Sequence, residues 1–342
     1  MSTPGLPRSR IELDLAAVRH NAGVLQAALG TSELWAVLKA DAYGHGAADV
    51  GRAVLEAGAS ALCVATVGEG ERLRSEFSTA RVIVLGPAAP TDIPRAVAAR
   101  LEVTSADGTI PGGVDVHLKL DTGMGRWGTD RLGELPANVV GVMSHFATAD
   151  TDPSFARTQL HRFEALTEHL AVPRHIANSA GLLTLPDSRL DAGRAGIALY
   201  GLSPFGGDPA DHGLRPALSW RSHLAQVKQL QAGESTGYGR LFVAERPTWV
   251  GLVPVGYADG FRRGLTGTSV LVDGERRTVV GTVSMDCFAV ELPAEMAVGT
   301  PVTLIGDGLL AEEHAKALDT ITYELMTGFC SAPSRVERVV TG

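Results

Sequence analysis

Short apolar runs alternate with helix-like segments through the first two-thirds of the chain, and this alternation limits the possible folds more than any other feature of the sequence. Most of the connecting stretches have the apolar period of an amphipathic helix. Repeated strand–helix units are typical of parallel sheets, and about eight of them predict a (β/α)8 barrel of the TIM type. The strand-like runs are 34–40, 61–66, 81–86, 101–105, 114–121, 139–147, 174–179 and 190–196.

One connection is too short to contain a helix. Between Ser105 and Val114 the chain has only the residues ADGTIPGG. A crossover between parallel strands normally takes about a dozen residues or more, most of them helical. We therefore expect one barrel helix to be missing or reduced to a turn.

The pattern changes after about Pro216, where apolar and polar residues begin to alternate with a period of two. Asp273 and Gly274 stand between two such runs and form a typical hairpin signal. Helical spacing returns only near 311–318 and 323–326. The chain of 342 residues is long enough for two domains. We predict a (β/α)8 barrel over residues 1–215 and a mostly β C-terminal domain over residues 216–342.

Charge and cysteine content argue against several functional classes. The net charge is −8 and Lys and Arg form no cluster, which argues against a nucleic-acid-binding surface. Cys63, Cys287 and Cys330 are far apart and show no CxxC spacing, so we expect neither a disulfide framework nor a metal site. The sequence shows no signal-peptide pattern and no apolar run of about 18 residues. We expect a cytoplasmic protein without a membrane or nucleic-acid partner.

Polar side chains that can take part in chemistry stand at or just after the ends of most predicted strands. In a (β/α)8 barrel these ends lie on one face, where the loops build the active site. The sequence therefore predicts an active site at this face. The residues are Lys39, Thr66, Ser105, Lys119, Asp121, His145, Asn178, Ser179 and Arg194.

Lys39 is the first candidate for a catalytic residue. It follows an apolar run in VLKADAYGHG and is itself followed by polar residues and glycines. The ordinary interpretation is a lysine that extends into solvent at a strand end. At the mouth of a barrel, a partly desolvated amine instead has a lowered pKa and can attack a carbonyl, as Schiff-base chemistry requires.

Two turns of small residues and one inward lysine add to this face. The segments 177–181 and 194–201 carry backbone N–H groups that an anion can approach, and Ser179 adds a hydroxyl. They form either a phosphate site or two ordinary strand–helix turns. Lys119 alternates with apolar residues and is predicted to point into the barrel, where it needs a charge partner or a changed charge state.

The motifs, taken in order, resemble those of the bacterial alanine racemase family and cover nearly the whole chain. They are VLKADAYGHG, HLKLDTGMGRWG, MSHFATAD, HIANSAG, RAGIALYG, GYGR, VGYADG, GTVSMD and TYE. The resemblance implies a pyridoxal 5′-phosphate enzyme with an eight-stranded barrel and a C-terminal β domain. It further implies that a homodimer with shared active sites interconverts L- and D-alanine and supplies D-alanine for peptidoglycan.

The resemblance also implies a role for each matching residue. Lys39 matches the lysine that holds the cofactor. Lys119 matches a lysine that is often carbamylated, a change that turns the inward cation into an anion able to orient Arg126. Residues that match the surroundings of the cofactor phosphate are Tyr43, Ser179, Gly196, Ile197 and Tyr323. Residues that match the substrate site are Arg126, the backbone of Met285 and, from the partner chain, Tyr257.

Arg194 matches the arginine that faces the pyridine nitrogen of the cofactor. A guanidinium group only donates hydrogen bonds and stays charged, so the nitrogen must be an unprotonated acceptor and the ring a weaker electron sink. Racemisation needs an acid or base on each face of the α-carbon. Lys39 supplies one, and Tyr238 matches the tyrosine of the second subunit that supplies the other. His145 matches a histidine that bridges Tyr238 and Arg194.

The chain departs from the family pattern in four places. Besides the short connection after Ser105, Ala195 replaces a proline, Thr282 replaces an arginine, and the tail is only loosely similar. We expect effects on packing, dimer stability and substrate range rather than on the core chemistry. Cys287 lies two residues from Met285 and receives no role.

Several alternatives stay open. The sequence does not fix the volume of the side-chain pocket, so a broader racemase of serine or another small amino acid fits as well. A cofactor-binding homologue that has lost activity is a second alternative. A barrel-fold decarboxylase is opposed by Arg194, and a non-enzymatic cofactor-binding protein is opposed by the second domain and by Tyr238 and Met285.

Overall fold

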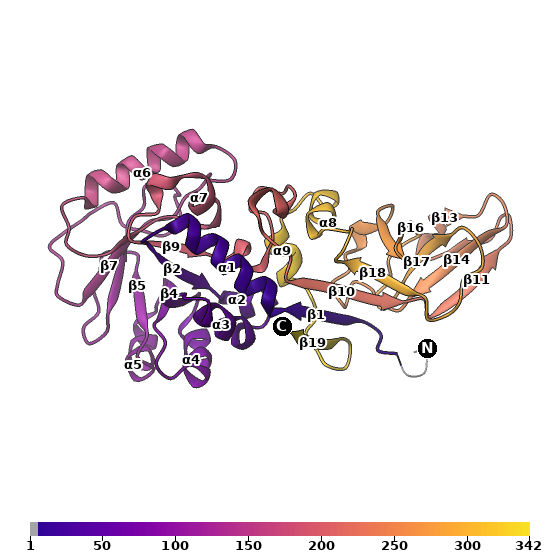
Figure 1. The fold of residues 1–342 in the computed structure, drawn as a ribbon, viewed down its shortest axis with the longest axis horizontal. Helices are drawn as coiled ribbons and strands as arrows, with labels where there is room; N and C mark the ends of the chain where they lie inside the picture. Colours follow the sequence, from indigo (N-terminus) through magenta and orange to yellow (C-terminus); the bar gives the residue numbers. More distant parts are fainter. Residues whose placement is uncertain (1–5) are drawn as a thin grey trace. The chain divides into compact units, whose positions relative to one another are not determined.

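The computed structural model describes residues 6–342 and divides into two compact units (Figure 1). One unit is Leu15–Arg215, and the other combines residues 6–14 with the segment Pro216–Gly342. Strand β1 (Arg10–Asp14) pairs antiparallel with β10 (Leu218–His223) and parallel with β19 (Glu337–Thr341). We predicted that residues 1–215 form the barrel domain. Because β1 pairs with strands of the β unit, it belongs to that unit and not to the barrel. In β1 the buried residues Ile11 and Leu13 alternate with more exposed residues, as is typical of a strand in a sheet with one exposed face.

The first unit is an eight-stranded parallel barrel, which confirms the predicted fold class. Its strands are β2 (Glu33–Val37), β3 (Ala61–Val64), β4 (Val82–Pro87), β5 (Glu102–Ser105), β6 (Val116–Lys119), β7 (Val139–Met143), β8 (Arg174–His175) and β9 (Ala192–Ala195). Neighbours pair in chain order, and β9 pairs with β2. Between β8 and β9 the N–H groups of Asp191 and Arg194 donate to the carbonyls of Arg174 and Ala177, at 3.1 and 3.0 Å, so the barrel is nearly closed.

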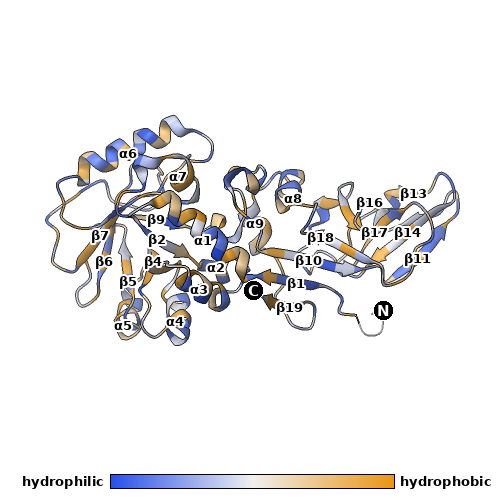
Figure 2. Ribbon diagram, in the orientation of Figure 1, coloured by the Kyte–Doolittle hydropathy of each residue, from blue (hydrophilic) through white to orange (hydrophobic). Residues whose placement is uncertain are grey.

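Amphipathic helices cover the outside of the barrel. Apolar and polar residues occupy different sides of α6, and its buried side includes Ala156, Leu160 and Phe163 (Figure 2). Asp152 caps α6 by accepting hydrogen bonds from the N–H groups of Ser154 and Phe155. The helices are α1 (Leu15–Leu29), α3 (Ala47–Glu56), α4 (Val67–Glu76), α5 (Ile93–Ala98), α6 (Pro153–Thr167) and α7 (Ser179–Thr184), and a short turn, α2 (Lys39–Tyr43), follows β2.

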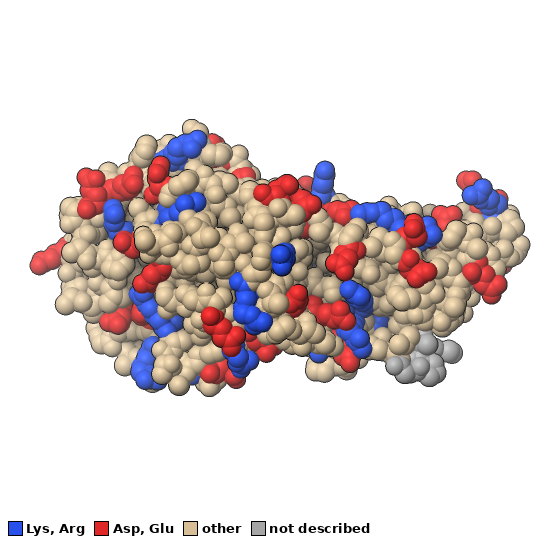
Figure 3. Space-filling view, viewed as in Figure 1, with Lys and Arg blue, Asp and Glu red and all other residues tan. Residues whose placement is uncertain are grey.

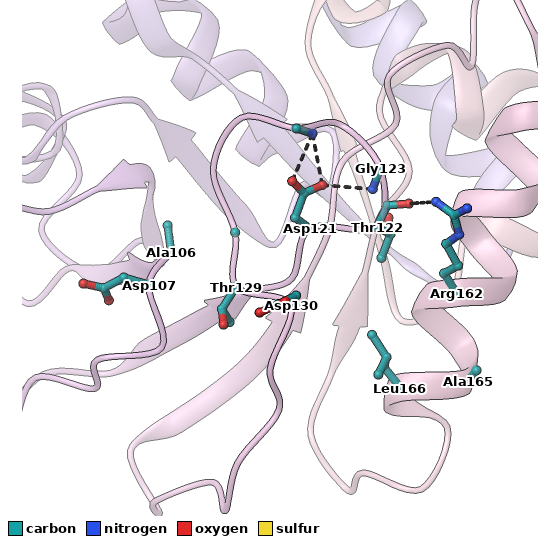
Figure 4. A pocket seen from close by; sticks show the side chains of 12 residues that line it. Ala106, Asp107, Asp121, Thr122, Gly123, Thr129, Asp130, Arg162, Ala165 and Leu166 are labelled. Carbon is teal, nitrogen blue, oxygen red and sulfur yellow. Dashed lines mark hydrogen bonds between the residues drawn. The ribbon is translucent and has the colours of Figure 1, made fainter.

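Two neighbouring barrel connections contain no helix. The structure has none in residues 106–115, the connection predicted to be too short, and none in residues 120–138 between β6 and β7. Apolar side chains of these loops, Ile110, Leu132 and Leu135, pack against the core instead. An open pocket of about 1000 Å³ is lined by other residues of these two loops and by residues of α6. There Asp121 accepts hydrogen bonds from the N–H groups of the loop that follows β6, and Arg162 of α6 donates to the carbonyl of Thr122 (Figure 4).

The second unit is built around a nine-stranded sheet. Asp273 and Gly274, with φ of 52° and 80°, form the predicted two-residue hairpin turn between β15 and β16. Helices α8 (Ala311–Ala317) and α9 (Thr322–Thr327) lie between β18 and β19 along the chain. The other strands of this sheet are β11 (Gln226–Leu230), β14 (Thr248–Val253), β15 (Ser269–Val272), β16 (Glu275–Val280), β17 (Phe288–Leu292) and β18 (Pro301–Ile305), while β12 (Ser235–Thr236) and β13 (Phe242–Val243) pair with each other in a separate two-stranded sheet.

The surface carries both signs of charge. On the face shown in Figure 3, acidic and basic side chains are interspersed over each unit. Within residues 6–342, no helix has both the length and the apolar content needed to cross a membrane.

Candidate active site

Lys39 lies just beyond the end of β2, as the first residue of the α2 turn. Burial lowers the pKa of its amine, and the nearby Arg126 and, more weakly, Arg194 lower it further, while Glu69 opposes them. A lysine with a lowered pKa is neutral in a larger fraction of molecules at a given pH, and only the neutral amine is a nucleophile or a base.

The turn after Lys39 is left-handed. Ala40, Asp41, Ala42 and Tyr43 all have φ between 52° and 55°. L-residues adopt this conformation at a cost of about 1–2 kcal/mol each, so the surroundings must hold it. The Glu69 carboxylate accepts from the N–H of Ala40 at 2.8 Å, and the Asp41 carboxylate accepts from the N–H of Ala47 at 2.8 Å. The turn thus fixes the direction in which Lys39 leaves the strand.

Four cationic side chains influence one another at this end of the barrel. Lys119 is buried, and burial together with Arg194, Arg126 and Lys39 lowers its pKa to about 8. Its Nζ lies 5.7 Å from the ring centre of Trp127, and the Arg126 guanidinium lies 5.3 Å from the same ring. Such a concentration of positive charge favours the binding of anionic groups.

Arg194 on β9 is 3% exposed and is held by several acceptors. Its Nη1 donates to Nδ1 of His175 at 2.6 Å and to the carbonyl of the same residue at 3.0 Å. Its Nη2 donates to the carbonyl of Ser144 at 2.8 Å and to Nδ1 of His145 at 3.2 Å. Within residues 6–342, none of its hydrogen bonds uses Nε, so this donor is uncommitted.

His145 is in contact with Arg194, as the sequence predicts. Burial and the charge of Arg194 keep the pKa of its imidazole well below the usual value, so the ring is neutral. Because Nδ1 accepts from Arg194, the single ring proton must be on Nε2. His145 therefore presents a donor on the side away from Arg194.

Ser179 and the start of the segment after β9 form a compact polar cluster. The Ser179 hydroxyl accepts from the N–H of Gly196 at 3.0 Å and from the N–H of Ala198 at 3.4 Å. A Cβ at Gly196 would lie 2.6 Å from the hydroxyl oxygen of Tyr43, so only glycine lets Tyr43 approach here. Ile197, the next residue, is fully buried and begins a 3-10 turn, Ile197–Tyr200. The structure thus brings Tyr43, Ser179, Gly196 and Ile197 together.

In the β unit, three predicted site residues lie on connected loops. Tyr238 is 75% exposed, and its carbonyl accepts from the Thr282 hydroxyl at 2.7 Å. Tyr257 and Met285 are 40% and 52% exposed. Their loops are joined because the N–H of Tyr257 donates to the carbonyl of Ser284 and the N–H of Ala258 to that of Met285. Thr282, noted in the sequence only as a departure, therefore supports the Tyr238 loop.

Two further residues of this unit were singled out in the sequence, Tyr323 as a site residue and Cys287 without a role. Tyr323 is half-buried in α9. The backbone carbonyl of Cys287 accepts a hydrogen bond from the N–H of Ser284. Its thiol is free, and we assign it no role. Cys63 and Cys330 are free thiols as well.

Sequence reasoning missed an ionic clamp under the Tyr257 and Met285 loops. Asp259 is buried, and its carboxylate accepts from the N–H of Gly256 at 2.9 Å. Arg335, in the tail, binds both oxygens of Asp259 at 2.7 and 3.1 Å and also binds Asp286 at 2.8 Å. Arg335 is visible in the tail together with Glu337 and Arg338, but nothing in the residue pattern indicated its partner.

Arg335→Met is expected to lower the free energy of unfolding by about 3 kcal/mol, because it removes both guanidinium hydrogen bonds of the buried Asp259 carboxylate and leaves only the more distant Arg8, at 3.7 Å, as a charged partner. It should also raise KM for an amino-acid substrate. Urea unfolding of the purified variant and initial-rate kinetics measure the two effects. The control is Arg10→Met, which removes an exposed pair with Glu337 and should cost less than about 1 kcal/mol. Equal losses in the two variants would contradict a specific clamp.

Both units match the models of a known protein family. Residues 13–204 match the family model of the alanine racemase N-terminal domain, and residues 217–340 match that of the C-terminal domain. Alanine racemase 1 of Bacillus subtilis is 40% identical, with 96% of this chain and 92% of its own length aligned. The alanine racemase of Levilactobacillus brevis is 40% identical over 96% of this chain and 98% of its own length.

Solved structures that resemble this chain are also alanine racemases. The crystal structure of alanine racemase from E. faecalis has a TM-score of 0.90 at 34% identity and covers 100% of both chains. That of the biosynthetic alanine racemase from Pseudomonas aeruginosa has a TM-score of 0.90 at 36% identity, covering 98% of this chain and 100% of the other.

Proposed function

The chain belongs to the alanine racemase family, an isomerase family, and from this premise we propose that it interconverts L- and D-alanine with the help of pyridoxal 5′-phosphate. The observation that carries the proposal is the desolvated Lys39 amine at the mouth of a barrel, beside Arg126 and Arg194. We further propose that it acts in the cytoplasm, in keeping with its three free thiols, and supplies D-alanine for peptidoglycan.

The residues present fit the cofactor. A phosphate group carries negative charge, and the Ser179 hydroxyl, whose oxygen already accepts from the N–H of Gly196, can donate its proton to a phosphate oxygen near the Tyr43 hydroxyl that Gly196 lets approach. Tyr43, Ile197 and Tyr323 would complete the phosphate surroundings. Lys39 would hold the cofactor covalently, and the uncommitted Nε of Arg194 would donate to its ring nitrogen. When bound, the cofactor withdraws electrons from the substrate α-carbon and acidifies its C–H bond.

Two bases would move the proton of the α-carbon. Lys39 serves one face, and Tyr238 of a second subunit serves the other. A phenol has an ordinary pKa of about 10, so Tyr238 needs a neighbour that stabilises its ionised form. The proton on Nε2 of the neutral His145 is a suitable donor for this purpose, and Arg194 holds the imidazole in that tautomer.

The substrate carboxylate would be held by Arg126 and by the backbone N–H of Met285, with Tyr257 of the partner subunit closing the pocket. Arg126 is exposed and already belongs to the cationic cluster near Lys39, where an anionic group is stabilised. A guanidinium group also binds a carboxylate with paired hydrogen bonds, which orients the α-carbon as well as retaining it.

Lys119 is expected to be carbamylated. Carbon dioxide adds to the neutral amine and forms an N–C bond with loss of one proton, and the lowered pKa of about 8 makes that neutral form available. The product is an anion among cations, which removes the cost of a buried positive charge. Labelling with ¹³C-bicarbonate should give a carbamate ¹³C signal that declines as the pH falls below about 8. The signal should vanish in Lys119→Arg and persist in Lys228→Arg; a signal that survives Lys119→Arg contradicts the assignment.

Shared sites predict complementation between two inactive variants. In a mixed dimer of Lys39→Ala and Tyr238→Ala, one site combines the intact Lys39 and the intact Tyr238. Random subunit exchange makes half of the dimers mixed, so activity should recover to about a quarter of the wild-type value. Rates measured before and after exchange provide the test, with each variant mixed with itself as the control. No recovery after demonstrated exchange would contradict shared sites.

A second candidate function is racemisation of serine or another small amino acid. The observation in its favour is Thr282, a small residue in place of the arginine of the family pattern, which forms a hydrogen bond to the Tyr238 loop. A cofactor-binding homologue without activity is the remaining alternative.

The proposed function is tested by incubating the cofactor-loaded protein with pure L-alanine and, separately, with pure D-alanine. Enantiomers have equal free energies, so both reactions should approach the same equal mixture. Chiral chromatography measures the two amino acids. Conversion of neither enantiomer by cofactor-loaded protein would support the inactive homologue instead.

A further inference from the structure

Among the residues that the structure describes, no anionic side chain binds directly to the positively charged Arg194. Arg194 is 3% exposed, and within residues 6–342 it forms no ion pair. Its hydrogen bonds go to backbone carbonyls and to the two imidazoles of His145 and His175. A buried charge without a counter-ion is strongly unfavourable, so the question is which anion balances this guanidinium.

The contacts of His175 lead to that anion. Its Nδ1 accepts from Arg194, and its Nε2 lies 3.0 Å from Nδ1 of His117. His117 in turn has its Nε2 2.7 Å from the carboxylate of Glu102. Both imidazoles are fully buried. The four side chains come from β5, β6, β8 and β9 and form a continuous path inside the barrel, here called the histidine chain.

The residues at the two ends of the histidine chain determine which ring nitrogen of each histidine carries the proton. Glu102 can only accept while it is ionised, and Arg194 can only donate. His117 must then carry its proton on Nε2 and His175 on Nε2, so that each ring donates toward Glu102 and accepts from the Arg194 side. Burial lowers the pKa of both imidazoles and keeps them neutral. Burial disfavours the ionised Glu102, but hydrogen bonds from His117 and Arg81 outweigh it and lower its pKa to about 2.

The surroundings hold this arrangement in place. Arg81 binds both oxygens of Glu102 at 2.7 and 2.9 Å and lies over the ring of Trp35. Trp35 packs edge-on against His175, with ring centres 4.4 Å apart. At Gly141 on β7, a Cβ would lie 2.6 Å from Nδ1 of His117, the atom that faces His175. A glycine at this position leaves the space that the contact between the two rings needs.

We propose that Glu102 is the counter-ion of Arg194, coupled to it through His117 and His175, and that it is a positioning residue for the arginine that faces the cofactor. The proposal rests on the proposed function, because it gives Arg194 its importance. The aligned hydrogen bonds hold Nη1 of Arg194 and leave Nε as the donor for the cofactor ring. Glu102 touches neither substrate nor cofactor in this account and acts only through the three residues between.

The test compares Glu102→Gln with Glu33→Gln. Glu33 is a matched control because its carboxylate also lies near Arg81, at 3.6 Å, and accepts from Trp35, but it is outside the histidine chain. In cofactor-free protein labelled with ¹⁵N-histidine, NMR reports which ring nitrogen carries the proton. In the wild type and in Glu33→Gln, His117 and His175 should be protonated on Nε2 alone. In Glu102→Gln, protons should redistribute over both nitrogens of His117, and the His175 signals should shift.

A second readout connects the histidine chain to the cofactor. Absorbance titration with pyridoxal phosphate should show affinity roughly 10-fold weaker in Glu102→Gln and unchanged in Glu33→Gln, a loss in the range seen when outer hydrogen-bond partners of a site are removed. The proposal is overturned if the two variants behave alike in both measurements, or if His175 of the wild type carries its proton on Nδ1.

Gly141→Ala keeps the proposal testable if Glu102→Gln does not fold. The added methyl group separates His117 from His175 while Glu102 and Arg81 stay paired, so the His175 signals should shift and cofactor affinity should fall; neither change occurring would overturn the proposal. Failure of the proposed function is recognised separately. A wild type that binds the cofactor without racemising alanine contradicts that function, while the tautomers and affinities still decide the role of Glu102.

Discussion

Lys39→Ala is expected to lose the covalent attachment of the cofactor and to reduce racemisation by roughly 1000-fold or more, since it removes the group that holds the cofactor and one of two bases at once. The structural reason is the position of its amine, desolvated at the barrel mouth and aimed by the left-handed turn of Ala40–Tyr43. Reduction with borohydride followed by peptide mass spectrometry measures the attachment, and chiral assays measure the rate.

The control for this variant is Lys228→Ala. Lys228 is exposed on β11 of the β unit, so its removal should change neither the attachment nor the rate. Circular dichroism and thermal unfolding show whether both variants keep the fold. The account would be contradicted if Lys39→Ala still bound the cofactor covalently or kept a rate within about 10-fold of the wild type.

Tyr238→Phe is expected to lose exchange of the α-proton from one enantiomer much more than from the other. The equilibrium constant between enantiomers is one, so kcat/KM must be equal in both directions for every variant, and racemisation rates cannot reveal the asymmetry. Proton exchange can, because each enantiomer presents its α-proton to a different base. The loss on the affected side should be about 100-fold to 10,000-fold, the usual contribution of a general base.

Deuterium uptake in heavy water, followed separately from L- and D-alanine by mass spectrometry, measures this effect. Leu241→Ala is the control, because it changes an exposed apolar side chain close to Tyr238 in the sequence and keeps the phenol. Any loss in that variant should be equal for the two enantiomers. Equal uptake from both enantiomers in Tyr238→Phe would contradict the assignment of two bases.

The sequence predicted the barrel well because buried parallel strands leave a strong local signal. All eight expected runs overlap with strands of the barrel, including the weak run at 190–196 that became β9. The hairpin at Asp273 was equally visible, since a two-residue turn with positive φ needs particular residues. Strand β1 was assigned to the wrong unit because five residues show a strand but not its partners.

The structure contains two local features that no residue pattern indicated. Ala40, Ala42 and Tyr43 are poor choices for a left-handed turn, and only the hydrogen bonds of Glu69 and Asp41 explain it. The second helix-free connection, residues 120–138, was hidden because the segment has an ordinary length for a strand–helix connection. Pro136 and four glycines, Gly123, Gly125, Gly128 and Gly133, are its available signals in retrospect.

The polar residues at the strand ends could be identified from the sequence, but the contacts between side chains of different strands could not. Lys39, Lys119, His145 and Arg194 were all recognised, because a polar residue after a buried run stands out. His117 and Glu102 lie inside the strands and read as ordinary interruptions of an apolar pattern. Only the nearly closed barrel brings β5, β6, β8 and β9 close enough for these side chains to meet.

The most direct test of racemisation is the initial rate from pure L-alanine and, separately, from L-serine, with cofactor occupancy at Lys39 measured in the same samples. The account predicts fast formation of D-alanine and slow formation of D-serine. Comparable rates would make the chain a racemase of broad specificity. No product from either amino acid, with Lys39 fully occupied, would contradict the proposed function.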